Sequence, residues 1–273
     1  MMFEVILSKD ADTIDVTTPS AGYTSGEVIQ LADGRAAYVQ GLTARTSGDA
    51  AALKTSGQVT LAKTASVVIL PGGRVYWDRS ANTATPLQIA AGADFYVGTA
   101  VNGAASADAT VVVDLNAKPQ YLVDLHADAF DTVLVGTSYL NMRGGQAYMQ
   151  FTTATEAEKI DLLSVKSVPV AIPAIFEAIF RVETAADADV ADLSVGLVNG
   201  THASDADSIT ESALFHQDSG ADLNLDAECD DGTAAEVAAT DTTVDIVAGA
   251  DVEVWIDARI LTALKYYVNG VRV

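Results

Sequence analysis

The sequence predicts an all-β protein, a small N-terminal β-barrel followed by a β-sandwich, and three observations support this. Short runs rich in Val, Ile, Thr and Tyr recur along the chain, and glycine-containing turns separate them. In the first half the turn signals recur about every 8–12 residues, a spacing typical of sandwiches and small barrels. In the second half several runs alternate apolar and polar residues, as half-buried strands do.

Strand signals in the first half end at a clear boundary. An apolar run at 67–70 stops at Pro71-Gly72-Gly73, and a second run follows at 74–78. Residues 111–115 place Val111, Val113 and Leu115 on one face of a further strand. Pro119 follows, and acidic residues become denser after it. We therefore expect one domain at residues 1–116, a linker at 117–122 and an acidic β-sandwich at 123–273.

Glycine-centred phrases recur through the first domain. Its turns contain Gly26, Gly48, Gly57 and Gly73, and its strands read Val75-Tyr76-Trp77-Asp78 and Tyr96-Val97-Gly98-Thr99-Ala100. In this order the phrases resemble the small cement, or decoration, proteins of tailed-phage capsids. The resemblance covers roughly residues 12–116, and an alanine-rich stretch at 43–52 is less typical of the family.

The resemblance to cement proteins carries several expectations. It implies a barrel or β-tulip-like fold in which glycines serve backbone geometry rather than catalysis. It implies a structural protein of the bacteriophage virion, placed on the outer surface of the capsid with the major capsid protein as its partner. It also implies a homotrimer at local three-fold sites of the lattice. Because no residue of the matching phrases is catalytic in the family, we expect no enzyme activity.

The second domain shows clearer strand faces. Phe176, Ala178, Phe180 and Val182 share one face of a strand, and Val252, Val254 and Ile256 share one face of another. Asn269-Gly270 between two short β runs predicts a two-residue hairpin, because this pair tolerates positive φ at both turn positions. Residues 155–166 are open to two interpretations, a short helix with a capping box at Thr155 and Glu158, or a turn followed by a strand.

The order of β runs in the second domain resembles the jelly roll of concanavalin and laminin-G domains. The runs lie at 176–183, 195–199, 212–215, 252–257 and 266–270. That fold normally continues for one or more strands beyond the hairpin, whereas this chain stops at Val273. The resemblance implies either an abbreviated sandwich or a last strand from elsewhere in the chain or from a neighbouring copy.

The charge of the chain is strongly negative and uneven. The formal net charge is −22; residues 1–117 carry 7 basic and 11 acidic side chains, and residues 118–273 carry 8 and 26. Such a surface repels phosphate backbones and anionic lipids, so we expect neither nucleic acid nor membrane as a partner. The same charge favours solubility. A divalent-cation site in the acidic half, with calcium as the ion, stays open as an alternative to having no cofactor.

The N-terminus and the apolar runs show no targeting or membrane signal. Residues 1–7 lack the basic start and long apolar centre of a signal peptide, and no apolar run reaches the roughly 18 residues of a membrane span. The single cysteine, Cys229, excludes an intrachain disulfide. We therefore expect synthesis in the host cytoplasm.

Residues able to perform chemistry are sparse, and none forms a known motif. His202 and His216 are 14 positions apart among acidic residues, which favours ordinary surface histidines over a metal site. The stretch 222–226 has the oxygens of a calcium loop, but Ala227 and Thr233 stand where an EF-hand needs Gly and Glu, so a strand is the better interpretation. Ser138 lacks the second glycine of a nucleophile elbow. Like charge beside Cys229 disfavours its thiolate.

Two tryptophans are the candidate contacts for a ligand or a partner. Trp77 and Trp255 could stack on sugar rings or lie against another subunit, and the alternative is that they fill the sandwich cores. Trp255 shares its strand face with Glu253 and Asp257, so we expect it to be the more outward of the two.

Together with these patterns, the resemblance to cement proteins implies a capsid decoration protein that binds and stabilises the phage head lattice through apolar contacts and projects a β-sandwich outward. The alternative is an adhesive module of the virion that binds carbohydrate or the host surface.

Overall fold

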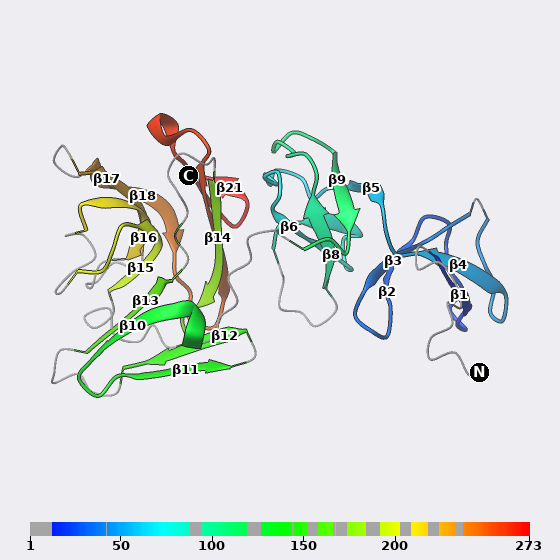
Figure 1. Cartoon of the computed structure of the whole chain (residues 1–273). Helices are drawn as coiled ribbons and strands as arrows, with labels where there is room; N and C mark the ends of the chain where they lie inside the picture. The colour runs from blue at the N-terminus through cyan, green and yellow to red at the C-terminus, as the bar shows by residue number, and fades with distance from the viewer. Residues whose placement is uncertain are drawn as a thin grey trace, which may run out of the picture. The chain divides into compact units, whose positions relative to one another are not determined.

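The computed structural model describes residues 13–41, 43–87, 94–118, 127–143, 145–151, 158–165, 167, 174–183, 192–202, 209–217, 224–232 and 237–273. The regular structure in these residues is β-strand apart from short 3₁₀ turns such as η1 (Ala127–Ala129) and η3 (Leu261–Ala263), so the all-β prediction is confirmed. The chain divides into two compact units, unit 1 (Met1–Gln120) and unit 2 (Tyr121–Val273) (Figure 1). No described helix is long and apolar enough to cross a membrane.

The described residues of unit 1 form two antiparallel sheets. The first has the order β1-β4-β3-β2 and contains β1 (Thr13–Thr17), β4 (Ala50–Lys54), β3 (Ala36–Val39) and β2 (Val28–Gln30). The second has the order β5-β9-β8-β6-β7 and contains β5 (Gln58–Ala62), β9 (Thr110–Leu115), β8 (Phe95–Ala100), β6 (Arg74–Asp78) and β7 (Thr83–Thr85).

The second sheet of unit 1 comes close to closing but stays open. One isolated bridge, Lys63–Ala84, joins its two ends. The bridge does not extend into a ladder, because it lies beyond the end of β5 and β7 is only three residues long. The described strands therefore form two open sheets, and the expectation of a small barrel in this unit is corrected.

The interior of unit 1 follows the alternation in its sequence. Ile29, Ala37, Val39 and Leu53 form the core of the first sheet. In the second sheet Val111, Val113 and Leu115 are buried, as the pattern at 111–115 predicts. The two sheets are joined by the side chain of Asn116, which follows β9 and bonds to the backbone of Ala36 on β3.

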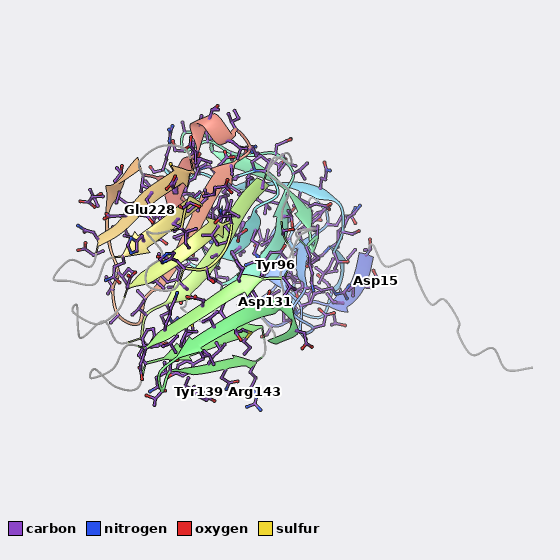
Figure 2. The ribbon with its side chains drawn as sticks, turned by 60° about the vertical axis from the view of Figure 1, so that its left-hand side comes forward. Asp15, Tyr96, Asp131, Tyr139, Arg143 and Glu228 are labelled. Carbon is purple, nitrogen blue, oxygen red and sulfur yellow. The ribbon has the colours of Figure 1, made fainter. Side chains whose placement is uncertain are left out.

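Unit 2 contains a pair of two-stranded antiparallel sheets. β10 (Phe130–Val135) pairs with β13 (Lys159–Ser164), and β11 (Tyr139–Arg143) pairs with β12 (Gln146–Gln150). Figure 2 shows Tyr139 and Arg143 of β11 at the outer edge of this part of the chain. β13 decides between the two interpretations of 155–166 in favour of the strand; residues 155–157 and 166 lie outside the described residues.

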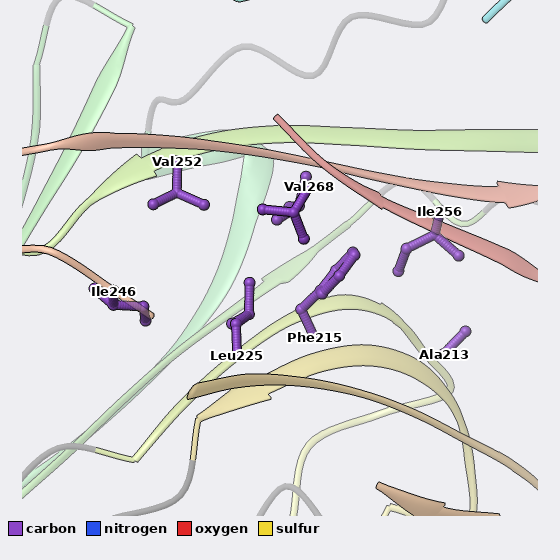
Figure 3. Close-up of a cluster of buried hydrophobic side chains, with 8 residues drawn as sticks. Ala213, Phe215, Leu225, Ile246, Val252, Ile256 and Val268 are labelled. Atoms are coloured by element: carbon purple, nitrogen blue, oxygen red, sulfur yellow. The ribbon is translucent and has the colours of Figure 1, made fainter. Parts of the chain in front are cut away.

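The larger part of unit 2 is a β-sandwich. One sheet has the order β14-β19-β20-β21, with β14 (Ala174–Arg181), β19 (Asp251–Ala258), β20 (Lys265–Val268) and β21 (Val271–Arg272). The other has the order β15-β16-β17-β18, with β15 (Leu193–Val198), β16 (Glu211–Gln217), β17 (Asn224–Asp231) and β18 (Val237–Asp245). Figure 3 shows the core between them, where Phe215 and Leu225 face Val252, Ile256 and Val268.

The strand faces predicted for unit 2 are confirmed. Phe176, Ala178, Phe180 and Val182 pack against the sandwich core, and Val252, Val254 and Ile256 belong to it. The hairpin at the C-terminus also forms, with Val268 opposite Val271 and positive φ at Asn269 (50°) and Gly270 (74°). The jelly-roll connectivity stays a prediction.

Candidate functional site

Trp255 lies in the interior of unit 2. Only 2% of the residue is exposed, and its indole N–H donates to Glu253 Oε1 at 2.9 Å. β19 is a central strand, with Glu177 of β14 and Tyr267 of β20 beside Trp255 in the ladder. The prediction of an outward Trp255 is therefore wrong. The face that carries Glu253, Trp255 and Asp257 is polar in sequence but is covered in the fold.

Trp77 is also an interior residue. It lies on β6 between Ala84 of β7 and Phe95 of β8, and 6% of it is exposed. Next to it Tyr76 packs edge-on against Tyr96, with 5.7 Å between the ring centroids. In the isolated chain neither tryptophan presents an open ring face for a sugar. Both side chains contribute buried apolar surface, which is the alternative that the sequence left open.

His216 is buried on β16, which corrects its prediction as a surface histidine. Its Nε2 lies 2.8 Å from Asp192 Oδ1, and its Nδ1 lies 3.5 Å from Glu228 Oε2. Both ring nitrogens therefore face carboxylates, an arrangement that satisfies a buried polar ring. His202 is half-buried, and its backbone oxygen accepts a bond from the Lys159 ammonium group. His126 lies outside the described residues. So do Asp205, Asp207 and Asp218, the aspartates close in sequence to His202 and His216.

Cys229 is partly buried on β17. Burial is the main cause that raises the pKa of its thiol, and the carboxylates of Asp230, Asp231 and Glu228 raise this pKa further. The like-charge effect expected from the sequence is therefore present, but burial is larger. Burial likewise raises the pKa of Tyr266, whose hydroxyl donates to the Glu228 backbone oxygen at 2.6 Å. A thiol held protonated is a poor nucleophile.

The other candidate positions are structural. Leu225 is fully buried on β17 between Asn224 and Asp226, so the strand interpretation holds for the described part of 222–226. The Ser138 hydroxyl donates to the backbone oxygens of Val135 at 2.9 Å and Lys159 at 3.2 Å, as a turn serine does. Across the described residues, no group of three or more His, Cys, Asp or Glu is arranged to hold a metal ion.

The surfaces of the two units differ in apolar character. In unit 1, the residues described include no large apolar side chain among those that are strongly exposed. All such side chains of the described chain lie in unit 2, and most of them gather on β10, β11 and β12 and the residue after β12. Unit 1 carries 8 basic and 11 acidic side chains, whereas unit 2 carries 7 and 26. Unit 1 is thus the nearly neutral unit, and unit 2 is the acidic one.

Comparison with known proteins finds a similarity in unit 1. Residues 8–115 match the family model described as phage cement protein. The matched segment covers fewer than half of the 273 residues but includes β1 to β9 and hence both sheets of unit 1. No curated protein and no solved structure matches the chain. The N-terminal unit of this chain is thus similar to phage cement proteins.

Proposed function

We propose that the protein is a capsid cement protein in which unit 1 binds the outer surface of the assembled phage head and unit 2 projects outward. The observation that carries this proposal is the family match, which includes all the strands that the structure describes in unit 1. The major capsid protein is the partner that the family implies, and a homotrimer at three-fold sites of the lattice is part of the proposal.

The charge distribution supports this division of roles. Unit 1, with 8 basic and 11 acidic side chains, can approach a protein lattice without strong repulsion. Unit 2, with 7 and 26, repels other acidic surfaces and stays hydrated. An outward layer of acidic sandwiches would keep decorated particles apart, because like-charged surfaces resist association.

The surface of unit 1 points to attachment through many modest contacts. Its described part lacks strongly exposed large apolar side chains, so we favour contacts from turns, polar side chains and strand edges over the apolar contacts that the sequence suggested. Weak contacts repeated over several linked copies sum to firm attachment, because each further contact of a bound oligomer forms at high effective concentration.

A protein that binds only the assembled lattice stabilises it by mass action. The test compares undecorated heads alone with heads saturated with the purified full chain, by heating and by transfer to low salt while DNA release is measured. We expect DNA release to shift to higher temperature in the saturated heads. Identical release with and without bound protein would contradict the cement role.

A matched pair of variants connects this effect to the fold of unit 1. Asn116→Ala removes the side chain that joins its two sheets, whereas Asn82→Ala alters an exposed asparagine that also has positive φ. We expect the Asn116 variant to lose protection of the heads and the Asn82 variant to keep it.

A further inference from the structure

The strands β10, β11 and β12, with the residue that follows them, carry an unusual surface, here named the hairpin surface (residues 130–143 and 145–151). Val133, Leu134 and Val135 are consecutive and all strongly exposed. Since neighbouring side chains of a strand point to opposite faces, β10 presents apolar groups to solvent on both faces. Further exposed apolar side chains come from β11, β12 and the residue after β12: Tyr139, Tyr148, Met149 and Phe151.

Exposing these apolar side chains to water is energetically unfavourable for a single chain. Each of the two sheets here has only two described strands, and isolated two-stranded sheets are marginally stable. Contiguous exposed apolar groups on a soluble protein mark an interaction surface. The composition of the hairpin surface also resembles that of an interface core. Protein interfaces are enriched in tyrosine, phenylalanine, methionine and arginine, and their cores contain few charged residues.

The charges of the hairpin surface indicate which partner fits. Residues 130–151 contain one acidic and one basic residue, Asp131 and Arg143, whereas unit 2 as a whole carries 26 and 7. At this part of unit 2 a second copy meets little local like-charge repulsion, although the acidic sandwiches as a whole still repel one another. Figure 2 labels both residues, and both side chains are exposed. Within the described residues, neither takes part in an ion pair.

Asp131 and Arg143 also make the surface self-complementary. A two-fold contact places the same patch of both copies face to face, so a residue i of one copy meets a residue j of the other and the reverse. In that arrangement Asp131 of each copy can face Arg143 of the other, and two ion pairs form around an apolar centre. The described strands leave one edge each of β10 and β11 without a β partner, and such edges readily add a strand from another chain.

We propose that the hairpin surface is an interface with a second copy of this chain, formed by the apolar side chains of β10 and β12 and flanked by reciprocal Asp131–Arg143 pairs. The contact lies in unit 2, outside the residues that match the cement family, and does not depend on capsid binding.

The test is sedimentation velocity of the full chain over a wide range of concentration, with Leu134→Asp and its matched control Leu261→Asp. The two leucines are 50% and 52% exposed, and Leu261 lies on η3, outside the hairpin surface. Both variants add the same charge to an exposed site. We expect Leu134→Asp to raise the dissociation constant about tenfold or more, since it buries a carboxylate in an apolar contact, and Leu261→Asp to behave as wild type. Tyr148→Asp on the other sheet should repeat the effect.

Charge exchange tests the reciprocal pairs. Asp131→Arg and Arg143→Asp should each weaken association, and the double variant D131R/R143D should restore it, because the pairs re-form with the charges exchanged. Higher salt should strengthen association of the wild type, since it screens the repulsion between the acidic sandwiches.

Three results would overturn the inference: a wild type that is monomeric at every concentration, equal effects of the two leucine variants, or no rescue by the double exchange. Capsid binding is scored separately. A chain that self-associates but does not bind heads would contradict the proposed function alone. One that binds heads as a monomer would contradict this inference and the proposed trimer, and would leave the proposed capsid binding intact.

Discussion

Asn116 and Ala36 are bonded to one another in both directions, although they are 80 residues apart. Asn116 Oδ1 accepts the Ala36 N–H at 2.8 Å, and Nδ2 donates to the Ala36 carbonyl at 2.9 Å and to the Thr55 carbonyl at 2.7 Å. The amide thereby reproduces the two bonds of an antiparallel residue pair. It links the end of β9 in one sheet to β3 in the other.

Replacement of Asn116 by alanine should destabilise unit 1. The change leaves the buried N–H and C=O of Ala36 without these partners, and it places alanine at a φ of 57°. We expect a loss of about 2–4 kcal/mol in the free energy of unfolding. The fluorescence of Trp77 during denaturation, in a Trp255→Phe background, reports on this unit because the chain has one tryptophan in each unit.

Asn82→Ala separates the hydrogen bonds from the backbone strain. Asn82 is exposed and has a φ of 55°. Its replacement therefore carries the cost of alanine in the left-handed conformation, without the loss of hydrogen bonds between the two sheets. If both variants lose the same stability, the bonds of Asn116 contribute nothing and the account of the joined sheets is wrong.

Gly98 is required where β8 meets β9. A Cβ at this position would lie 2.0 Å from the Asp114 backbone oxygen, and the φ of 156° is itself unusual for other residues. We expect Gly98→Ala to destabilise unit 1 by several kcal/mol, roughly 3 or more, because the rigid strands must separate. Gly57→Ala is the control: its φ is 94° but its Cβ would meet nothing within 4 Å, so only the cost of the φ applies, about 1 kcal/mol. Equal unfolding midpoints would contradict the close approach.

Asp257 should make the stability of unit 2 depend on pH. Arg259 donates to both of its carboxylate oxygens at 2.8 Å and thereby lowers the pKa of Asp257, against a smaller opposing effect of burial. A carboxylate with a lowered folded-state pKa adds stability above its unfolded value of about 3.9, and this is lost as the pH falls through the folded value. Asp257→Asn should therefore cost about 1–2 kcal/mol at neutral pH, and its difference from wild type should fade below about pH 4.

Asp33 provides the matched control, since Arg35 stands at the same spacing and also lowers its pKa. The Asp33 pair is exposed, whereas the Asp257 side chain is 5% exposed. Asp33→Asn should leave the pH profile of unfolding unchanged. Trp255 fluorescence in a Trp77→Phe background follows Asp257→Asn in unit 2, and Trp77 fluorescence in a Trp255→Phe background follows Asp33→Asn in unit 1. A gap between Asp257→Asn and wild type that persists at low pH would show that lost packing, and not charge, is responsible.

Local patterns predicted the strands of this protein well, because the period of side chains along a strand is itself local. The faces at 176–182 and 252–256 and the turn at Asn269-Gly270 needed no knowledge of the rest of the chain. Residues 155–166 stayed ambiguous, since a single run of apolar residues fits both a helix and a strand.

The errors concern how sheets are covered and closed. Trp255 stands among acidic residues in sequence, yet its strand is central and both faces are buried. His216 likewise has acidic residues near it in sequence but is buried on a central strand, β16. The hydrogen bonds between Asn116 and Ala36 have no local sequence signal. An asparagine after a strand is common, and its partner here lies 80 residues away in the sequence. The exposed apolar side chains of β10, β11 and β12 were not predicted, since the sequence alone does not show which strands lack a covering layer.

The central claim is that unit 1 binds the assembled head, and co-sedimentation of the purified full chain with undecorated, expanded capsids tests it most directly. The account predicts saturable binding with a fixed number of copies per lattice site, retained by Asn82→Ala and lost by Asn116→Ala. Failure of the wild-type chain to sediment with the capsids at any concentration would contradict it.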